Sequence, residues 1–88
     1  MYYVMLEGKA RKELKKMESG YKERIFQALA TLKEVPTPFK LYDLKKIEGL
    51  EDTYRIRISS YRLIYRAYWK ENTIRILKID RRSETTYK

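Results

Sequence analysis

The sequence predicts an α+β fold in which an N-terminal helical hairpin packs on a mainly antiparallel four-stranded sheet. Two helical patterns of apolar residues fill residues 9–32, whereas strict alternation of apolar and polar residues marks residues 53–58. Polar breaks at residues 59–60 and 71–72 separate three strand-like segments, which is typical of an antiparallel meander. We therefore expect the order β-α-α-β-β-β, within a single domain over residues 1–88.

The N-terminal elements follow from two changes of pattern. Tyr2–Leu6 is aromatic and apolar, which favours a short strand. From Lys9 onward apolar residues recur at helical spacing while lysine and arginine fill the other face; they are Ala10, Leu14 and Met17. The first helix should end at Ser19-Gly20, a polar and glycine-containing break.

A second apolar stripe predicts the other helix of the hairpin. Its members are Tyr21, Ile25, Ala28, Leu29 and Leu32. Pro36 and Pro38 end it, because proline lacks the amide hydrogen that a helix needs. Residues 39–51 then form a mixed connection without a clear strand pattern.

The C-terminal half predicts three consecutive strands. In Thr53–Ile58 the apolar residues and the arginines point to opposite faces, because side chains alternate along a strand. A second strand runs from Tyr61 to about Trp69, and a third covers Thr73–Asp80. The N-terminal strand should join the same sheet, at a position that the sequence does not fix.

Composition narrows the possible functions. The 21 Lys and Arg residues outnumber the 12 Asp and Glu residues, giving a formal charge of +9, which favours a polyanion such as nucleic acid as partner. Cysteine and histidine are absent, which removes disulfides, thiolate metal sites and the commonest general base. We expect no cofactor and no metal. No run is long enough to span a membrane, and Met1–Leu6 is too short for a signal peptide, so we expect a cytoplasmic protein.

A tight turn at Ser59-Ser60 would gather arginines on one face of the sheet. It sets Arg57 directly opposite Arg62, with Arg55 on the same face. Facing like charges destabilise a sheet by about 0.2–1 kcal/mol, a cost that a bound polyanion would offset. In the last strand, a two-residue loop would place Arg81 opposite Arg62, and a bulge would place Arg82 there.

Two stretches carry a resemblance to a known family. Residues 54–65, Tyr-Arg-Ile-Arg-Ile-Ser-Ser-Tyr-Arg-Leu-Ile-Tyr, resemble the central hallmark of the RelE/ParE toxin superfamily. Residues 79–83 followed by Tyr87 resemble the closing motif of that superfamily. The resemblance extends over essentially the whole chain. It departs in the turn, where the usual Gly-Asp is Ser59-Ser60, and at two basic positions that are lysine in some RelE proteins.

The resemblance implies a toxin of a type II toxin–antitoxin system that cleaves mRNA in the ribosomal A site through attack by the 2′-OH. It carries the family's functional positions to Arg55, Arg57, Arg62, Arg82 and Tyr87. We also expect RNA contacts from Arg81, Lys45 and Lys46. The expected partners are mRNA, the ribosome and a cognate antitoxin, acidic and partly disordered before it binds.

Two other functions remain open at this stage. A ParE-like protein would share the fold and the central motif but would poison DNA gyrase without cleaving RNA. A non-catalytic RNA-binding member of the fold would use the same arginines only to contact phosphates. The arginines at positions 55 and 57 keep that alternative open, because arginine does not give up its proton as a lysine of lowered pKa does. The general base is not identified.

Overall fold

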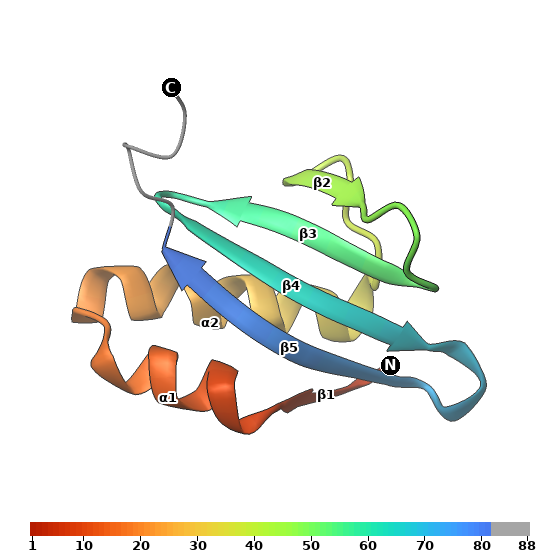
Figure 1. Cartoon of the computed structure of the whole chain (residues 1–88), viewed down its shortest axis with the longest axis horizontal. Coiled ribbons are helices and arrows are strands. Elements are labelled where there is room, and N and C mark those ends of the chain that lie inside the picture. The colour runs from red at the N-terminus through yellow and green to blue at the C-terminus, as the bar shows by residue number, and fades with distance from the viewer. Residues whose placement is uncertain (82–88) are drawn as a thin grey trace.

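The computed structural model describes residues 1–81 and confirms the α+β class (Figure 1). Within residues 1–81, two helices lie against one face of a single twisted sheet, and neither helix covers the other face. The elements in chain order are β1 (Tyr3–Leu6), α1 (Gly8–Lys16), α2 (Ser19–Glu34), β2 (Asp43–Lys46), β3 (Thr53–Ile58), β4 (Tyr61–Tyr68), the 3₁₀ turn η1 (Trp69–Glu71) and β5 (Thr73–Arg81). None of the helices within residues 1–81 is long and apolar enough to cross a membrane.

In the described part of the chain the sheet has five strands in the order β1-β5-β4-β3-β2, one more than the sequence predicted. Strand β1 runs parallel to β5, and the remaining neighbours are antiparallel, so the sheet is mainly antiparallel as expected. The additional strand is β2, in the segment interpreted as a connection. Its pattern is short but strand-like, because half-buried Tyr42 and Leu44 alternate with exposed Asp43 and Lys45.

The core lies between the helices and the inner face of the sheet. Its fully buried side chains include Ile25 and Leu32 of α2, Ile56 of β3, Leu63 and Tyr65 of β4, and Ile74 and Ile76 of β5. The predicted stripe of α2 is confirmed, since Ile25, Ala28, Leu29 and Leu32 are its buried residues. The break between the helices lies at Met17-Glu18 instead of the expected Ser19-Gly20, which forms the first turn of α2.

The β3–β4 hairpin has the predicted two-residue turn, with Ile58 paired to Tyr61 and Arg57 paired to Arg62. The β4–β5 hairpin differs from the prediction. Its loop consists of η1 and Asn72, so that Tyr68 pairs with Thr73, and a bulge interrupts the pairing between Ile64 and Tyr65. Together these two features shift the register by one residue.

The shifted register overturns one prediction about the site. Asp80 lies opposite Arg62, at the position that the sequence analysis left to Arg81 or Arg82. Arg81 pairs instead with Tyr61 and lies 5.9 Å from the centre of its ring. Arg82 and Tyr87 lie outside the described residues. The loop length of the second hairpin was the wrong assumption, because only Glu71-Asn72 had been taken as its turn.

Candidate functional site

Three arginines meet on the outer face of the sheet, the face not covered by the helices. Arg55 and Arg57 come from β3 and Arg62 comes from β4; we call these three the arginine cluster. Arg57 and Arg62 are direct cross-strand partners, and Arg55 lies opposite Ile64, two residues farther along. Residues that pair across antiparallel strands share a face, so the sequence-based prediction of one arginine-rich face is confirmed.

The arginine cluster is flanked by two carboxylates. Asp43 of β2 pairs with Arg57, and Asp80 of β5 pairs with Arg62, which gives the row Asp43, Arg57, Arg62, Asp80 across four strands. Asp43 lies 3.2 Å from Arg55 and 3.6 Å from Arg57, while Asp80 lies 3.5 Å from Arg62. These acidic residues relieve the repulsion between the facing arginines that the sequence analysis had left uncompensated.

The ion pairs leave Arg57 and Arg62 accessible, whereas Arg55 is only 15% exposed beside Asp43. The side chains of Arg57 and Arg62 are 42% and 43% exposed, and the carboxylate of Asp43 is 57% exposed. Solvated ion pairs of this kind contribute only about 0–1 kcal/mol. An arriving phosphate can therefore exchange with the carboxylates, because a guanidinium binds a phosphate in the same forked geometry.

Further cations surround the arginine cluster. Lys45 pairs with Arg55 from β2, and Lys78 pairs with Ile64 from β5, so both lie on the outer face. Lys78 is also 3.4 Å from Asp80. Five cationic side chains thus share this region with two carboxylates, which leaves a net positive surface. Lys46 pairs with Tyr54, on the other face, and is not brought to the cluster.

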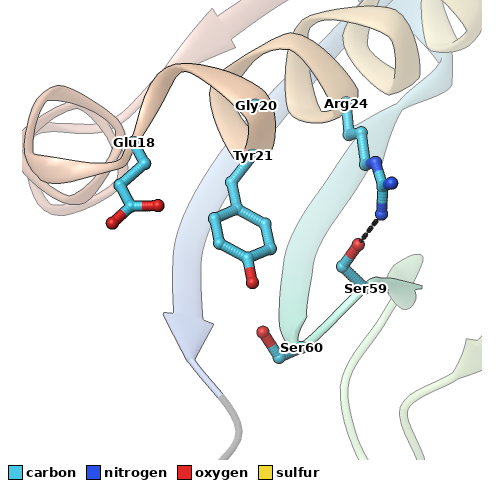
Figure 2. A pocket seen from close by; sticks show the side chains of 6 residues that line it. All are labelled: Glu18, Gly20, Tyr21, Arg24, Ser59 and Ser60. Carbon is cyan, nitrogen blue, oxygen red and sulfur yellow. Dashed lines mark hydrogen bonds between the residues drawn. The ribbon is translucent and has the colours of Figure 1, made fainter.

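Helix α2 supports the turn that aligns Arg57 with Arg62 (Figure 2). The guanidinium of Arg24 donates a hydrogen bond to the hydroxyl of Ser59. Tyr21 packs edge-on against Tyr61 with ring centres 5.3 Å apart. A hollow of about 490 Å³ lies between α2 and the turn, with Tyr21, Arg24, Ser59 and Ser60 among its lining residues. The helix layer therefore fixes the end of the hairpin that carries the arginines.

Sequence reasoning missed the two flanking carboxylates. Asp43 was placed in a loop, and Asp80 was set one position away from its true partner. The alternation of Tyr42 and Leu44 with Asp43 and Lys45 was the available signal for β2. For Asp80 the signal was weaker, since a bulge in the register is not visible in the sequence.

The assembled groups suit binding and charge stabilisation of a phosphodiester. Guanidinium groups can hold two phosphoryl oxygens at once and can stabilise the extra negative charge of a pentacovalent transition state. Within residues 1–81 no three acidic side chains gather into a set that could hold a metal ion. Tyr65 is too deeply buried to act here, and its hydroxyl donates to the carbonyl of Pro36 at 2.6 Å.

Comparison with known proteins agrees with this architecture. The family model described as "ParE toxin of type II toxin-antitoxin system, parDE" matches residues 4–86. A protein of Methanocaldococcus jannaschii, provisionally named toxin RelE1, is 32% identical over 87 residues, covering 99% of this chain and 96% of that protein. The chain belongs to the RelE/ParE toxin superfamily.

Two solved RelE structures are similar to this chain. Archaeal RelE from Pyrococcus horikoshii, crystallised as a RelE–RelB complex, has a TM-score of 0.85 and 32% identity, with 94% of this chain and 97% of that chain covered. RelE in the intact Escherichia coli RelBE toxin–antitoxin complex has a TM-score of 0.81 and 23% identity, covering 96% and 100%. The second likeness shows the shared fold of RelE/ParE toxins.

Proposed function

We propose that this RelE/ParE superfamily member is a RelE-type toxin that cleaves mRNA in the ribosomal A site. The single observation that carries the proposal is the pairing of Arg57 with Arg62 beside Arg55 on the face of the sheet opposite the helices. The two facing guanidinium groups are balanced by partly exposed carboxylates that a phosphate can replace. Binding and cleaving a polyanion gives that arrangement a use.

The proposed reaction is an internal transfer. The 2′-OH attacks the adjacent phosphate, the bond to the 5′-oxygen breaks, and the products are a 2′,3′-cyclic phosphate and a 5′-OH. Arg55, Arg57 and Arg62 hold the phosphoryl oxygens and stabilise their added charge. Arg82 and Tyr87 complete the proposed site from the C-terminal residues, with Tyr87 as the candidate to orient or accept the 2′-OH proton. The ribosome positions the mRNA, which supplies proximity that a small protein lacks.

A tightly bound antitoxin is part of the proposal. The Pyrococcus horikoshii relative was crystallised with RelB, and this chain has a surplus of positive charge that an acidic partner would complement. We propose a partner that is acidic and partly disordered until it binds. Its binding should raise the melting temperature of this chain by mass action, and the product of the neighbouring gene is the protein to test.

Primer extension on mRNA incubated with purified ribosomes and this protein tests the ribonuclease. We expect cleavage within the A-site codon by the unaltered chain and little cleavage of naked RNA. Arg62→Ala should lower the rate by about 100- to 1000-fold, as expected for the loss of one donor to a developing anion. The matched control is Arg11→Ala, which removes the same charge from the exposed surface of α1. Equal cleavage by the Arg62→Ala and Arg11→Ala proteins would remove the assigned site.

Poisoning of DNA gyrase is the second candidate, because the matching family model is described for ParE toxins. The same preparation should be incubated with gyrase and supercoiled DNA. Trapped double-strand breaks without mRNA cleavage would replace the ribonuclease proposal by the gyrase alternative. RNA binding with neither activity would identify a non-catalytic member of the fold.

A further inference from the structure

The outer face of the sheet carries a second arginine pair, away from the arginine cluster. Arg66 of β4 lies directly opposite Arg75 of β5, and the next pair along these strands is Tyr68 with Thr73. Tyr3 of β1 pairs with Thr73 from the other side. Cross-strand partners share a face, so Tyr3, Arg66, Tyr68 and Arg75 lie on the outer face; we call these four residues the platform.

The platform combines positive charge with exposed aromatic surface. The guanidinium of Arg66 lies 5.0 Å from the centre of the Tyr68 ring, and that of Arg75 lies 6.0 Å from it. Tyr3 is 76% exposed. Tyr3 and the two guanidinium groups therefore lie on one face of the sheet, with Thr73 of β5 between Tyr3 and Tyr68. An exposed ring and guanidinium groups on one face have the chemistry of a surface that stacks nucleobases and binds phosphates.

Carboxylates also accompany this second pair. Arg66 is 3.5 Å from Glu51, and Arg75 is 2.6 Å from Glu7. The side chains of Arg66 and Arg75 nevertheless remain 38% and 45% exposed, and the Glu51 carboxylate is 79% exposed. The platform thus repeats the arrangement of the arginine cluster, namely facing arginines held by partly solvated carboxylates that a phosphate can replace.

We propose that the platform is a second RNA-binding surface, which holds a strand of RNA by stacking a base on Tyr3 and contacting phosphates with Arg66 and Arg75. The inference rests on the proposed ribonuclease function, because it extends the RNA path beyond the cleavage site. Arg62 and Arg66 are four residues apart on β4, or about 13 Å, so one RNA segment can reach both regions. The bound RNA is the mRNA, because the segment that enters the arginine cluster can continue along β4 onto the platform.

RNA binding measured over a series of salt concentrations tests the platform. The probes are a short 2′-O-methylated single-stranded RNA, which cannot undergo 2′-OH attack, and protein-free small-subunit ribosomal RNA. The double variant Arg66→Ala/Arg75→Ala should weaken binding at least 10-fold. It should also reduce the slope of log K against log salt by about 1.4, since each lost phosphate contact to a single strand contributes about 0.7. Tyr3→Ala should weaken binding about 10-fold and leave the slope unchanged, because stacking is not an ionic contact.

Controls separate the platform from net charge and from folding. Arg11→Ala/Lys12→Ala removes two positive charges from the exposed surface of α1 and should keep the affinity within about twofold. Arg66→Lys/Arg75→Lys keeps both charges and should restore the salt slope. A thermal melt of each variant verifies that the sheet remains folded.

The outcomes distinguish the RNA source and the two proposals. Weaker binding of the single-stranded RNA supports the mRNA as the occupant, whereas weaker binding of the ribosomal RNA alone overturns that assignment. Unchanged binding of both probes by the Arg66→Ala/Arg75→Ala and Tyr3→Ala proteins overturns the platform. In that case a cleavage defect in Arg62→Ala still supports the ribonuclease. Absence of mRNA cleavage by the unaltered chain, together with impaired RNA binding by the platform variants, refutes the ribonuclease and leaves the RNA surface.

Discussion

Strand β4 shows how differently the two faces of one sheet are used. Its odd-numbered residues Tyr61, Leu63, Tyr65 and Ala67 are buried against the helices, whereas its even-numbered residues Arg62, Ile64, Arg66 and Tyr68 are partly exposed on the outer face. Neighbouring residues therefore have different physical tasks. The inner face holds the fold together, and the outer face can carry like charges because the inner face keeps the strands in place.

The two faces differ in how far a substitution lowers the stability of the protein. On the inner face, removing buried apolar atoms loses transfer free energy and leaves a cavity. On the outer face, the arginines belong to partly solvated ion pairs that contribute little to stability. Substitutions at adjacent positions should thus separate the stability of the sheet from its interaction with RNA.

The largest expected effect on the fold comes from Leu63→Ala. Leu63 is fully buried, so the substitution should lower the free energy of unfolding by about 2–5 kcal/mol. The adjacent Arg62→Ala, on the other face, should change it by less than about 1 kcal/mol. Urea denaturation of both variants measures the contrast. A loss of stability in Arg62→Ala as large as that in Leu63→Ala would mean that the outer face is structural.

Tyr65→Phe tests the inner face of β4 by removing one hydroxyl group. The Tyr65 hydroxyl donates to the Pro36 carbonyl at 2.6 Å and ties the inner face of β4 to the segment that follows α2. Without the Tyr65 hydroxyl the partly buried carbonyl of Pro36 loses its hydrogen-bond donor. The free energy of unfolding should therefore fall by about 1–2 kcal/mol. Thermal denaturation at neutral pH measures the loss, and Tyr3→Phe is the exposed control.

The same substitution should change the response to alkali. Burial, with a smaller contribution from Tyr54, raises the pKa of Tyr65 above its ordinary value of 10. Above pH 10 the unfolded chain therefore releases this proton before the folded chain does, so the unfolded state binds fewer protons and stability falls as pH rises. Tyr65→Phe should flatten that decline relative to Tyr3→Phe. Identical slopes in the two variants would show that Tyr65 does not titrate in this way.

Substitutions of Ser59 test the β3–β4 turn, which sets the register and so decides which residues lie on each face. Its φ of 56° lies in the left-handed region that favours glycine. Ser59→Gly and Ser59→Ala both remove the hydroxyl that accepts from Arg24, but only glycine relieves the backbone. We expect the glycine variant to exceed the alanine variant by about 1 kcal/mol in free energy of unfolding. Equal stabilities in the denaturation curves would refute strain at this position.

The inner face of β3 was predictable because burial on one face requires apolar residues at every second position of a strand. Tyr54, Ile56 and Ile58 alternate with arginines, and the two-residue turn at Ser59-Ser60 then fixes the pairing of Arg57 with Arg62 without reference to any distant residue. The same reasoning failed in the next hairpin. There the register between β4 and β5 was changed by the longer loop of η1 and Asn72 and by the bulge beside Ile64. Such features depend on packing more than on local sequence pattern.

The edges of the sheet were also beyond sequence reasoning. The pairing of β1 with β5 joins residues about 70 positions apart, and no local signal encodes that contact. Strand β2 is only four residues long and pairs on one side, so its pattern is brief. For this reason Asp43 and the platform emerged only when the strands were placed side by side, whereas the arginine cluster depended on one hairpin.

The smallest expected effect comes from Asp80→Asn. This substitution tests whether the carboxylates on the outer face only compete with RNA for the arginines or also stabilise the fold. Asp80 lies 3.5 Å from Arg62 and 3.4 Å from Lys78. Removing its charge leaves both cations free for phosphate, so the affinity for 2′-O-methylated RNA should rise a few-fold and its salt slope should steepen. Because these ion pairs are partly solvated, the free energy of unfolding should change by less than about 1 kcal/mol.

The control for Asp80→Asn is Glu13→Gln, which removes the same charge beside Lys16 on α1 and should leave the affinity for RNA unchanged. A loss of stability of more than about 2 kcal/mol in Asp80→Asn, with no gain in RNA affinity, would place Asp80 in the framework of the sheet. The outer face would then resist substitution as the inner face does. A gain in RNA affinity with little loss of stability would instead show that RNA displaces the Asp80 carboxylate from Arg62. A phosphate and a carboxylate compete for the same guanidinium.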